Sequence, residues 1–149
     1  MEDARSAVAE RATARDVRIA VTGDARALVD RDRCVQIFIN LLDNAIRHSP
    51  RGSRVRVRVD RQPRGHAIVS VADSGPGFSR EVIEADGRPF AAGRDGNVGL
   101  GLAIARLLAV AHGGALTIGK GSGGGMVSVT FSDARAPTDK NPAGPNTRL

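Results

Sequence analysis

The sequence predicts an α+β two-layer sandwich, in which about three helices cover one face of a mixed, mostly antiparallel β-sheet. Segments with a strand-like period of two and segments with a helical period follow one another as strand, helix, two strands, helix, two strands. Of the 149 residues, 41% are hydrophobic, which is enough for one core. With no Trp, no Tyr and four Phe, that core must be mainly aliphatic.

The first third of the chain predicts a long helix preceded by short strands. Residues 1–14 are rich in Ala, Arg and Glu, which indicates a short helical lead-in. Residues 17–21 and 27–29 are strand candidates. From about Asp32 to His48 apolar residues recur at helical spacing, which predicts an amphipathic helix.

Residues 54–59 alternate arginine with valine, which predicts a strand that turns its valines toward the core. A turn near residues 63–65 leads into a second strand over 67–72, so the two form a hairpin. The arginine row on the other side of the first strand has two interpretations. It is either an ordinary solvated face or a surface for an anionic partner.

The second half predicts a short helix near residues 81–85, a polar, Gly-rich loop over 86–98 and a buried helix over 100–111. Strands over 115–118 and 126–131 follow, joined by a Gly-rich turn. Residues 133–149 contain three Pro and little apolar content, which predicts a disordered tail. The expected organisation is therefore a lead-in over 1–14, one domain over 15–132 and the tail.

Composition excludes several classes of protein. Twenty of the 22 basic residues are Arg and the net charge is +6, but the arginines are scattered and stacking aromatics are scarce, which disfavours nucleic-acid binding. A lone cysteine, Cys34, excludes a disulfide framework and a Cys-based zinc site. The N-terminus lacks a signal peptide, and no apolar run is long enough to span a bilayer. We expect a cytoplasmic location, at the inner membrane face if a partner or a missing sensor region anchors it.

The first motif with chemical content lies on the long helix. Asn40 and Asn44 are four residues apart, so their side chains share one helix face, and Arg47 follows within one turn. An amide oxygen is a suitable ligand for Mg²⁺, and an arginine can reach a phosphate. The alternative is that these are ordinary polar residues of a helix end.

A second motif, Asp73-Ser-Gly75-Pro-Gly77-Phe78, ends the strand over 67–72. A carboxylate at a strand end can accept a hydrogen bond from an exocyclic amine, and the glycines allow a close approach of the backbone. A plain turn would have the same composition.

The third motif, Gly96-Asn-Val-Gly99-Leu-Gly101, opens the helix over 100–111. Glycine-rich entries into helices bind phosphate through free backbone N–H groups. The segment lacks the Gly-Lys-Ser/Thr ending of a Walker A loop, and a loop rather than a strand precedes it. A flexible hinge is the alternative.

In their order and separation the three motifs resemble the GHKL ATPase superfamily, which includes histidine kinases, Hsp90, gyrase and MutL. The segment NLLDNAIRHSP is similar to the N box of a two-component sensor histidine kinase, DSGPGF to its G1 box, and GNVGLGLAIARLLAVAHGG to its G2 box. The resemblance covers about residues 15–132. It implies the Bergerat ATP-binding fold, ATP and Mg²⁺ as cofactors, and protein-histidine kinase activity within a two-component system.

The resemblance also implies roles for individual residues. Asn44 matches the Mg²⁺ ligand, Asn40 lies beside the phosphates, Arg47 contacts phosphate and His48 lies near the nucleotide. Asp73 matches the residue that binds the adenine amino group, in a pocket shaped by Gly75 and Gly77. The expected lid and lid-to-helix hinge residues are Phe90, Gly99, Leu100, Gly101 and Leu102.

Two features depart from the family pattern. The lid is short, with 21 residues between Gly77 and Gly99, and its F box is reduced to Arg88-Pro-Phe90. No phosphoacceptor motif occurs in residues 1–30, and no histidine precedes His48. We therefore expect a phosphoacceptor (dimerisation) domain supplied in trans, with a response regulator as an indirect partner, for either a fragment or a free-standing subunit.

Two alternatives from other classes stay open at this stage. One is an anti-sigma-factor-like serine kinase and binding module, which shares the ATP-binding fold. The other is a degenerate nucleotide-binding interaction module, which the short lid favours.

Overall fold

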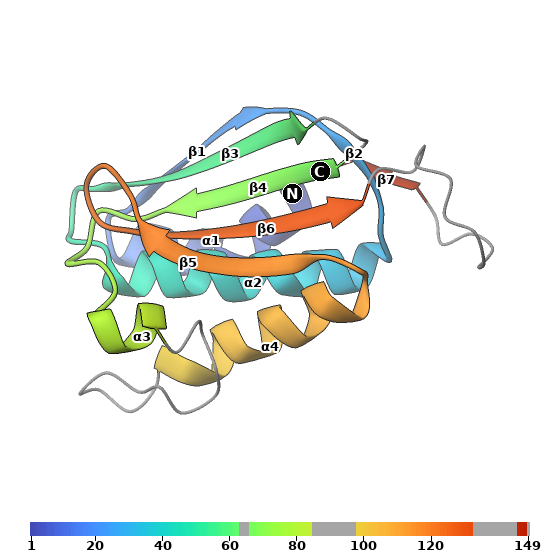
Figure 1. Ribbon diagram of the computed structural model, residues 1–149. Helices are drawn as coiled ribbons and strands as arrows, with labels where there is room; N and C mark the ends of the chain where they lie inside the picture. Colours follow the sequence, from blue (N-terminus) through green and yellow to red (C-terminus); the bar gives the residue numbers. More distant parts are fainter. Residues whose placement is uncertain (63–65, 85–97, 133–145, 149) are drawn as a thin grey trace.

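A five-stranded mixed sheet forms one layer of the molecule (Figure 1). The computed structural model describes residues 1–62, 66–84, 98–132 and 146–148. The strand order is β1-β3-β4-β6-β5, with β1 parallel to β3 and the other neighbours antiparallel, which confirms the predicted fold class. The strands are β1 (Arg18–Gly23), β3 (Arg54–Gln62), β4 (His66–Ala72), β5 (Ala115–Lys120) and β6 (Gly125–Ser132).

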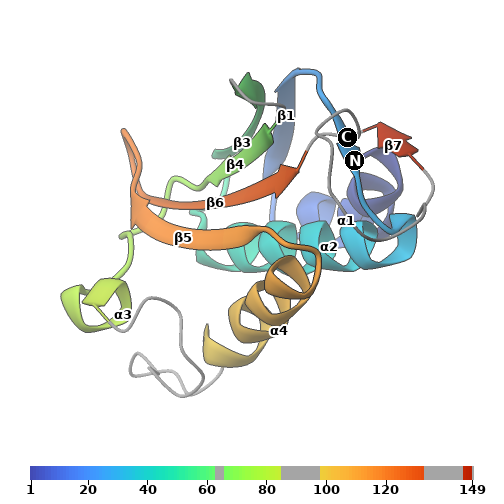
Figure 2. The same cartoon turned by 45° about the vertical axis from the view of Figure 1, so that its right-hand side comes forward.

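Three helices form the second layer, all on the same side of the sheet (Figures 1 and 2). They are α1 (Glu2–Ala14), α2 (Arg31–His48) and α4 (Val98–Ala111), and a short α3 (Arg80–Glu84) lies near one end of the sheet. The Asp30 side chain accepts a hydrogen bond from the Arg33 backbone N–H (3.0 Å) and so fixes the start of α2. Among the described residues, no helix has both the length and the apolar character needed to cross a bilayer.

The core lies between the sheet and the helices. Val55, Val57 and Val59 of β3 are buried, while the arginines between them are exposed, as the alternation predicted. Phe38 of α2 and Phe131 of β6 are fully buried, with ring centroids 5.9 Å apart. This aromatic pair joins the middle of α2 to the C-terminal end of β6.

Two terminal segments differ from what the sequence predicted. Helix α1 is more than a lead-in, because Ala4, Val8 and Ala12 are buried in the same core cluster and the helix packs against α2. In the predicted tail, residues 146–148 form strand β7, which pairs antiparallel with β2 (Arg26–Leu28). Such pairing depends on a distant partner strand, so local composition does not reveal it.

Replacing Phe38 tests the aromatic pair. Phe38→Ala removes a fully buried ring and leaves a cavity, so we expect a loss of about 3–5 kcal/mol in the free energy of unfolding, measured with urea. The matched control is Leu107→Ala on α4, where the side chain is 67% exposed and we expect a change within about 0.5 kcal/mol. Similar losses in both variants would contradict this assignment of the core.

Candidate functional site

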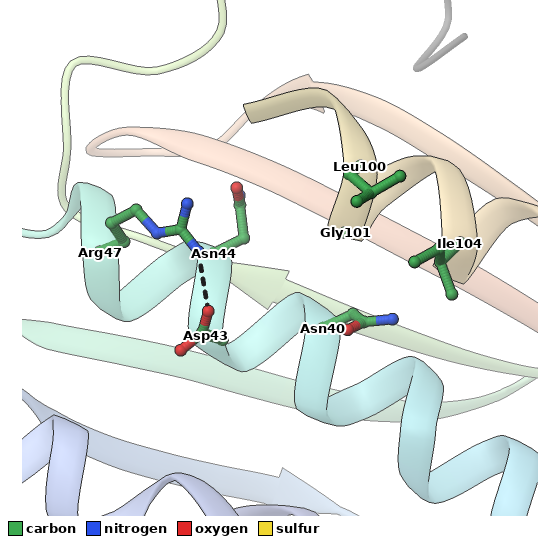
Figure 3. A pocket seen from close by; sticks show the side chains of 7 residues that line it. All are labelled: Asn40, Asp43, Asn44, Arg47, Leu100, Gly101 and Ile104. Carbon is green, nitrogen blue, oxygen red and sulfur yellow. Dashed lines mark hydrogen bonds and ion pairs between the residues drawn. The ribbon is translucent and has the colours of Figure 1, made fainter. Parts of the chain in front are cut away.

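A pocket of about 270 Å³ lies between α2 and the first turns of α4 (Figure 3). It brings together five of the residues expected at the site: Asn40, Asn44, Arg47, Leu100 and Gly101. Asp43 and Ile104 complete its lining, and sequence reasoning had not included either of them.

The two asparagines bring unused hydrogen-bonding groups to this pocket. The Asn40 Nδ2 group is buried and has no partner among the described residues, although its Oδ1 accepts from Gln36 Nε2 at 3.4 Å. The Asn44 side chain is 7% exposed and forms no hydrogen bond with a described residue. Leaving a buried polar group such as Asn40 Nδ2 unsatisfied costs about 1–3 kcal/mol, so its position beside the pocket indicates a polar ligand.

Arg47 is positioned by a shared carboxylate. Asp43 Oδ2 is 2.9 Å from Arg47 Nη2, and Asp43 Oδ1 is 2.8 Å from Nε of Arg11 on α1. A guanidinium has five N–H donors, so Arg47 can bind a second anion while it keeps this contact. The i,i+4 spacing of Asp43 and Arg47 was the one sequence signal for this role.

Asp73 lies in a loop of close backbone contacts after β4. The residue is 6% exposed, and its Oδ1 accepts hydrogen bonds from the backbone N–H groups of Gly75 (2.8 Å) and Gly125 (3.0 Å). The Asp73 N–H in turn donates to the Gly125 carbonyl (3.0 Å). Among the described residues nothing donates to Oδ2, so that oxygen can accept a hydrogen bond from a ligand.

Glycines make this loop possible because side chains would not fit. A Cβ on Gly75 would collide with the His48 carbonyl oxygen at the end of α2. A Cβ on Gly125 would lie 2.7 Å from Asp73 Oδ2 and 2.8 Å from the Phe78 ring. The sequence had assigned the glycines near 121–125 mainly to turns, whereas the structure places Gly125 against the aspartate.

Of the other residues expected at the site, Leu102, His48 and Gly77 do not line the α2–α4 pocket. Leu102 is 2% exposed and belongs to the core, so its side chain does not line the pocket. His48 ends α2, and its Nε2 is buried without a partner among the described residues. Gly77 adopts a positive φ of 82°, and Gly99 lies in the first turn of α4. Phe90 and the loop expected over 86–98 lie outside the described residues, apart from residue 98, which begins α4.

Comparison with known proteins identifies the family to which the chain belongs. The sequence model of the family described as "Histidine kinase-, DNA gyrase B-, and HSP90-like ATPase" matches residues 29–135, so the chain belongs to this family.

Individual relatives narrow the comparison to histidine kinases. The chain is 43% identical over 109 residues to the signal transduction histidine-protein kinase/phosphatase MprB of Mycolicibacterium smegmatis, covering 70% of this chain and 21% of that protein. It is 37% identical over 121 residues to the histidine protein kinase DivJ of Caulobacter vibrioides, covering 77% and 20%. The chain thus spans about a fifth of the length of these curated relatives.

Solved structures agree with this family assignment. A mycobacterial sensor histidine kinase MprB matches with a TM-score of 0.74 and 27% identity, covering 88% of this chain and 93% of that one. The catalytic domain of the histidine kinase ThkA has the same fold, with a TM-score of 0.77 and 24% identity over 89% of each chain.

Two glycine substitutions test the close contacts of the site. We expect Gly75→Ala to lower the free energy of unfolding by about 1–3 kcal/mol, because the added Cβ meets backbone that cannot retreat. Gly101→Ala is the matched control, since a Cβ there has nothing within 4 Å and alanine favours a helix interior. Thermal or urea unfolding measures both, and a Gly75→Ala variant as stable as the parent chain would exclude the close contact.

Proposed function

We propose that this chain binds Mg²⁺·ATP and transfers the γ-phosphoryl group to a histidine on a separate phosphoacceptor (dimerisation) domain. The observation that carries the proposal is the state of Asp73. One carboxylate oxygen is held by two backbone N–H groups and the other is available, in a chain that belongs to an ATPase family.

The adenine base would bind at the Asp73 loop. Asp73 Oδ2 accepts a hydrogen bond from the exocyclic amino group, while the bonds to Oδ1 hold the carboxylate in place. Gly75 and Gly77 leave room for the flat base to approach the backbone. His48 lies next to this loop, because its carbonyl packs against Gly75.

The phosphates would lie between α2 and the start of α4. Asn44 supplies an amide oxygen to Mg²⁺, which commonly combines one or two protein ligands with substrate phosphates and waters. Asn40 and Arg47 donate to phosphate oxygens from the same helix. The first turn of α4, with Gly99, Leu100 and Gly101, offers backbone N–H groups and the positive end of a helix dipole.

The remaining lid residues have supporting roles in this proposal. Leu102 anchors the first turn of α4 in the core, which fixes the direction of those N–H groups. Phe90 is assigned to the lid on its motif alone.

The proposed transfer needs no covalent intermediate on this chain. An imidazole nitrogen of the acceptor histidine attacks the γ-phosphorus, and the bond to the β,γ-bridging oxygen breaks as ADP leaves. Bound Mg²⁺ offsets the charge that develops on the phosphate oxygens. Arg47 and the backbone N–H groups of α4 orient the phosphates and stabilise the same charge. In this proposal the general base is a carboxylate beside the acceptor histidine on the phosphoacceptor domain, rather than a residue of this chain.

The relatives favour this proposal over its alternatives. Those compared above are histidine kinases, and no observation on the described residues favours the serine kinase or the degenerate module.

The first test is Asp73→Asn. The amide oxygen can still accept from Gly75 and Gly125, so the loop keeps its bonds, but an NH₂ group replaces the oxygen that would accept from adenine. We expect ATP affinity, measured by calorimetry, to fall about 10- to 100-fold. The variant loses the hydrogen bond between the adenine amino group and a charged carboxylate oxygen, and it leaves that amino group facing another donor.

The control for this test is Asp60→Asn on β3, which neutralises a half-buried carboxylate outside the pocket. Its ATP affinity should match that of the parent chain. Unchanged affinity in a folded Asp73→Asn variant would overturn the adenine site.

The second test is Asn44→Ala. We expect weaker ATP binding in the presence of Mg²⁺ and little change in EDTA, because the substitution removes the metal ligand and leaves the adenine contact intact. Equal losses under both conditions would assign Asn44 to the nucleotide itself.

Phosphoryl transfer is tested directly with γ-labelled ATP and a phosphoacceptor domain taken from a sensor histidine kinase. The expected product carries label that acid removes, as a phosphohistidine does. Acid-stable label on a hydroxyl side chain would favour the serine-kinase alternative instead.

A further inference from the structure

The face of the sheet that points away from the helices is basic along β1 and β3. We call this surface, formed by the outward positions of the five strands, the outer face. Figure 2 shows α1, α2 and α4 all on the opposite side. Arg18 on β1 and Arg54, Arg56 and Arg58 on β3 are exposed there, because their valine neighbours on β3 point into the core.

The strand register places these arginines in one continuous row. Arg18 pairs with Arg54 across the parallel β1–β3 ladder, where neighbouring strands lie about 4.8 Å apart. Successive outward residues of β3 follow at about 6.6 Å along the strand.

The arginines in the row differ in their partners. Arg56 donates to the Ser122 hydroxyl (3.0 Å), and Arg58 pairs with Asp60 (2.8 Å). Arg18 and Arg54 have no side-chain partner among the described residues. The two guanidinium groups on adjacent strands are therefore available to a ligand.

Apart from Asp60, which pairs with Arg58, the rest of the outer face is mainly neutral and rich in hydroxyl groups. Ser70 and Ser128 are hydrogen bonded to each other across β4 and β6 (2.9 Å), and Thr22 extends the polar surface on β1. Within the described part of the sheet, Asp60 is the one carboxylate at an outward position. The outer face thus carries an excess of positive charge.

Folding alone does not explain this arrangement. Like charges directly opposite each other on adjacent strands destabilise a sheet, and Arg18 and Arg54 are such a pair. A threonine at either position would suit a solvated strand as well.

We propose that the outer face docks an acidic protein surface, whose carboxylates pair with Arg18, Arg54 and the neighbouring arginines. A guanidinium fork matches a carboxylate in geometry and charge. Nucleic acid is disfavoured because the described outward positions carry no Phe, Tyr or Trp for stacking on bases, and the one imidazole among them, His66, lies at the far end of β4 from Arg18 and Arg54. A lipid surface is disfavoured because the direct cross-strand neighbours of Arg56 and Arg58 are Ala20, Thr22, Ser70 and Ala72, which are small or carry a hydroxyl group. The two large apolar side chains at outward positions, Ile68 and Met126, lie opposite Asp60 and Ala72 rather than opposite an arginine.

The test variant is Arg18→Thr/Arg54→Thr, and the probe is a 20-residue polyglutamate peptide titrated into the full chain. We expect the peptide affinity to fall at least about tenfold, because two charge-assisted contacts are lost. The stability should stay the same or rise, because the substitution relieves the like-charge pair. ATP affinity should stay unchanged, because neither residue lines the α2–α4 pocket.

The matched control is Arg15→Gln/Arg33→Gln, which removes two exposed arginines of the helical layer. The proposal requires this control to bind the peptide nearly as well as the parent chain. It is overturned if the control loses as much affinity as the test variant, or if the parent chain does not bind the peptide. It is also overturned if a single-stranded oligonucleotide or phosphatidylserine vesicles bind these arginines more tightly than the peptide does.

Discussion

Helix α2 packs one side against the apolar core and lines a polar pocket with another. The arrangement of the core and of the pocket therefore depends on the rotation of this one helix about its axis. Phe38 packs against Phe131 of β6, which fixes the rotation of the helix over the sheet. That rotation turns Asn40 and Asn44 toward α4 rather than into the core. The geometry of the pocket is therefore set by burial of apolar surface on the other side of the same helix.

The position of the Asp73 loop also depends on α2, because the loop packs against the C-terminal end of that helix. Gly75 packs directly on the His48 carbonyl, so the position of the aspartate depends on where the helix ends. The loop gains little apolar burial from its glycines, and it holds an aspartate that is buried, with the residue 6% exposed. Such an arrangement is poor for stability and good for pre-organised binding, because the carboxylate is oriented before a ligand arrives.

Sequence reasoning succeeded where the relevant physics is local. The helical period of α2 and the strict alternation of β3 follow from which side chains must be buried, and both elements lie where the sequence predicted them. It did not succeed where distant segments meet. Gly125 reaches Asp73 only because β4 pairs with β6, and Asp43 joins Arg11 to Arg47 only because α1 packs on α2. Strand β7 has the same explanation, since its partner β2 lies more than a hundred residues earlier.

The net charge of +6 acquires a structural meaning once its distribution is known. Several arginines of the helical layer have a carboxylate nearby, as Arg5 has Glu2 and Arg31 has Asp3, so their charge is locally balanced. Exposed pairs of this kind contribute little to stability, but they do remove a local excess of charge. On β1 and β3, Arg18 and Arg54 face each other instead, and the resulting field extends from the layer opposite the α2–α4 pocket. A partner bound there would leave the α2–α4 pocket open, so the two surfaces can be occupied together.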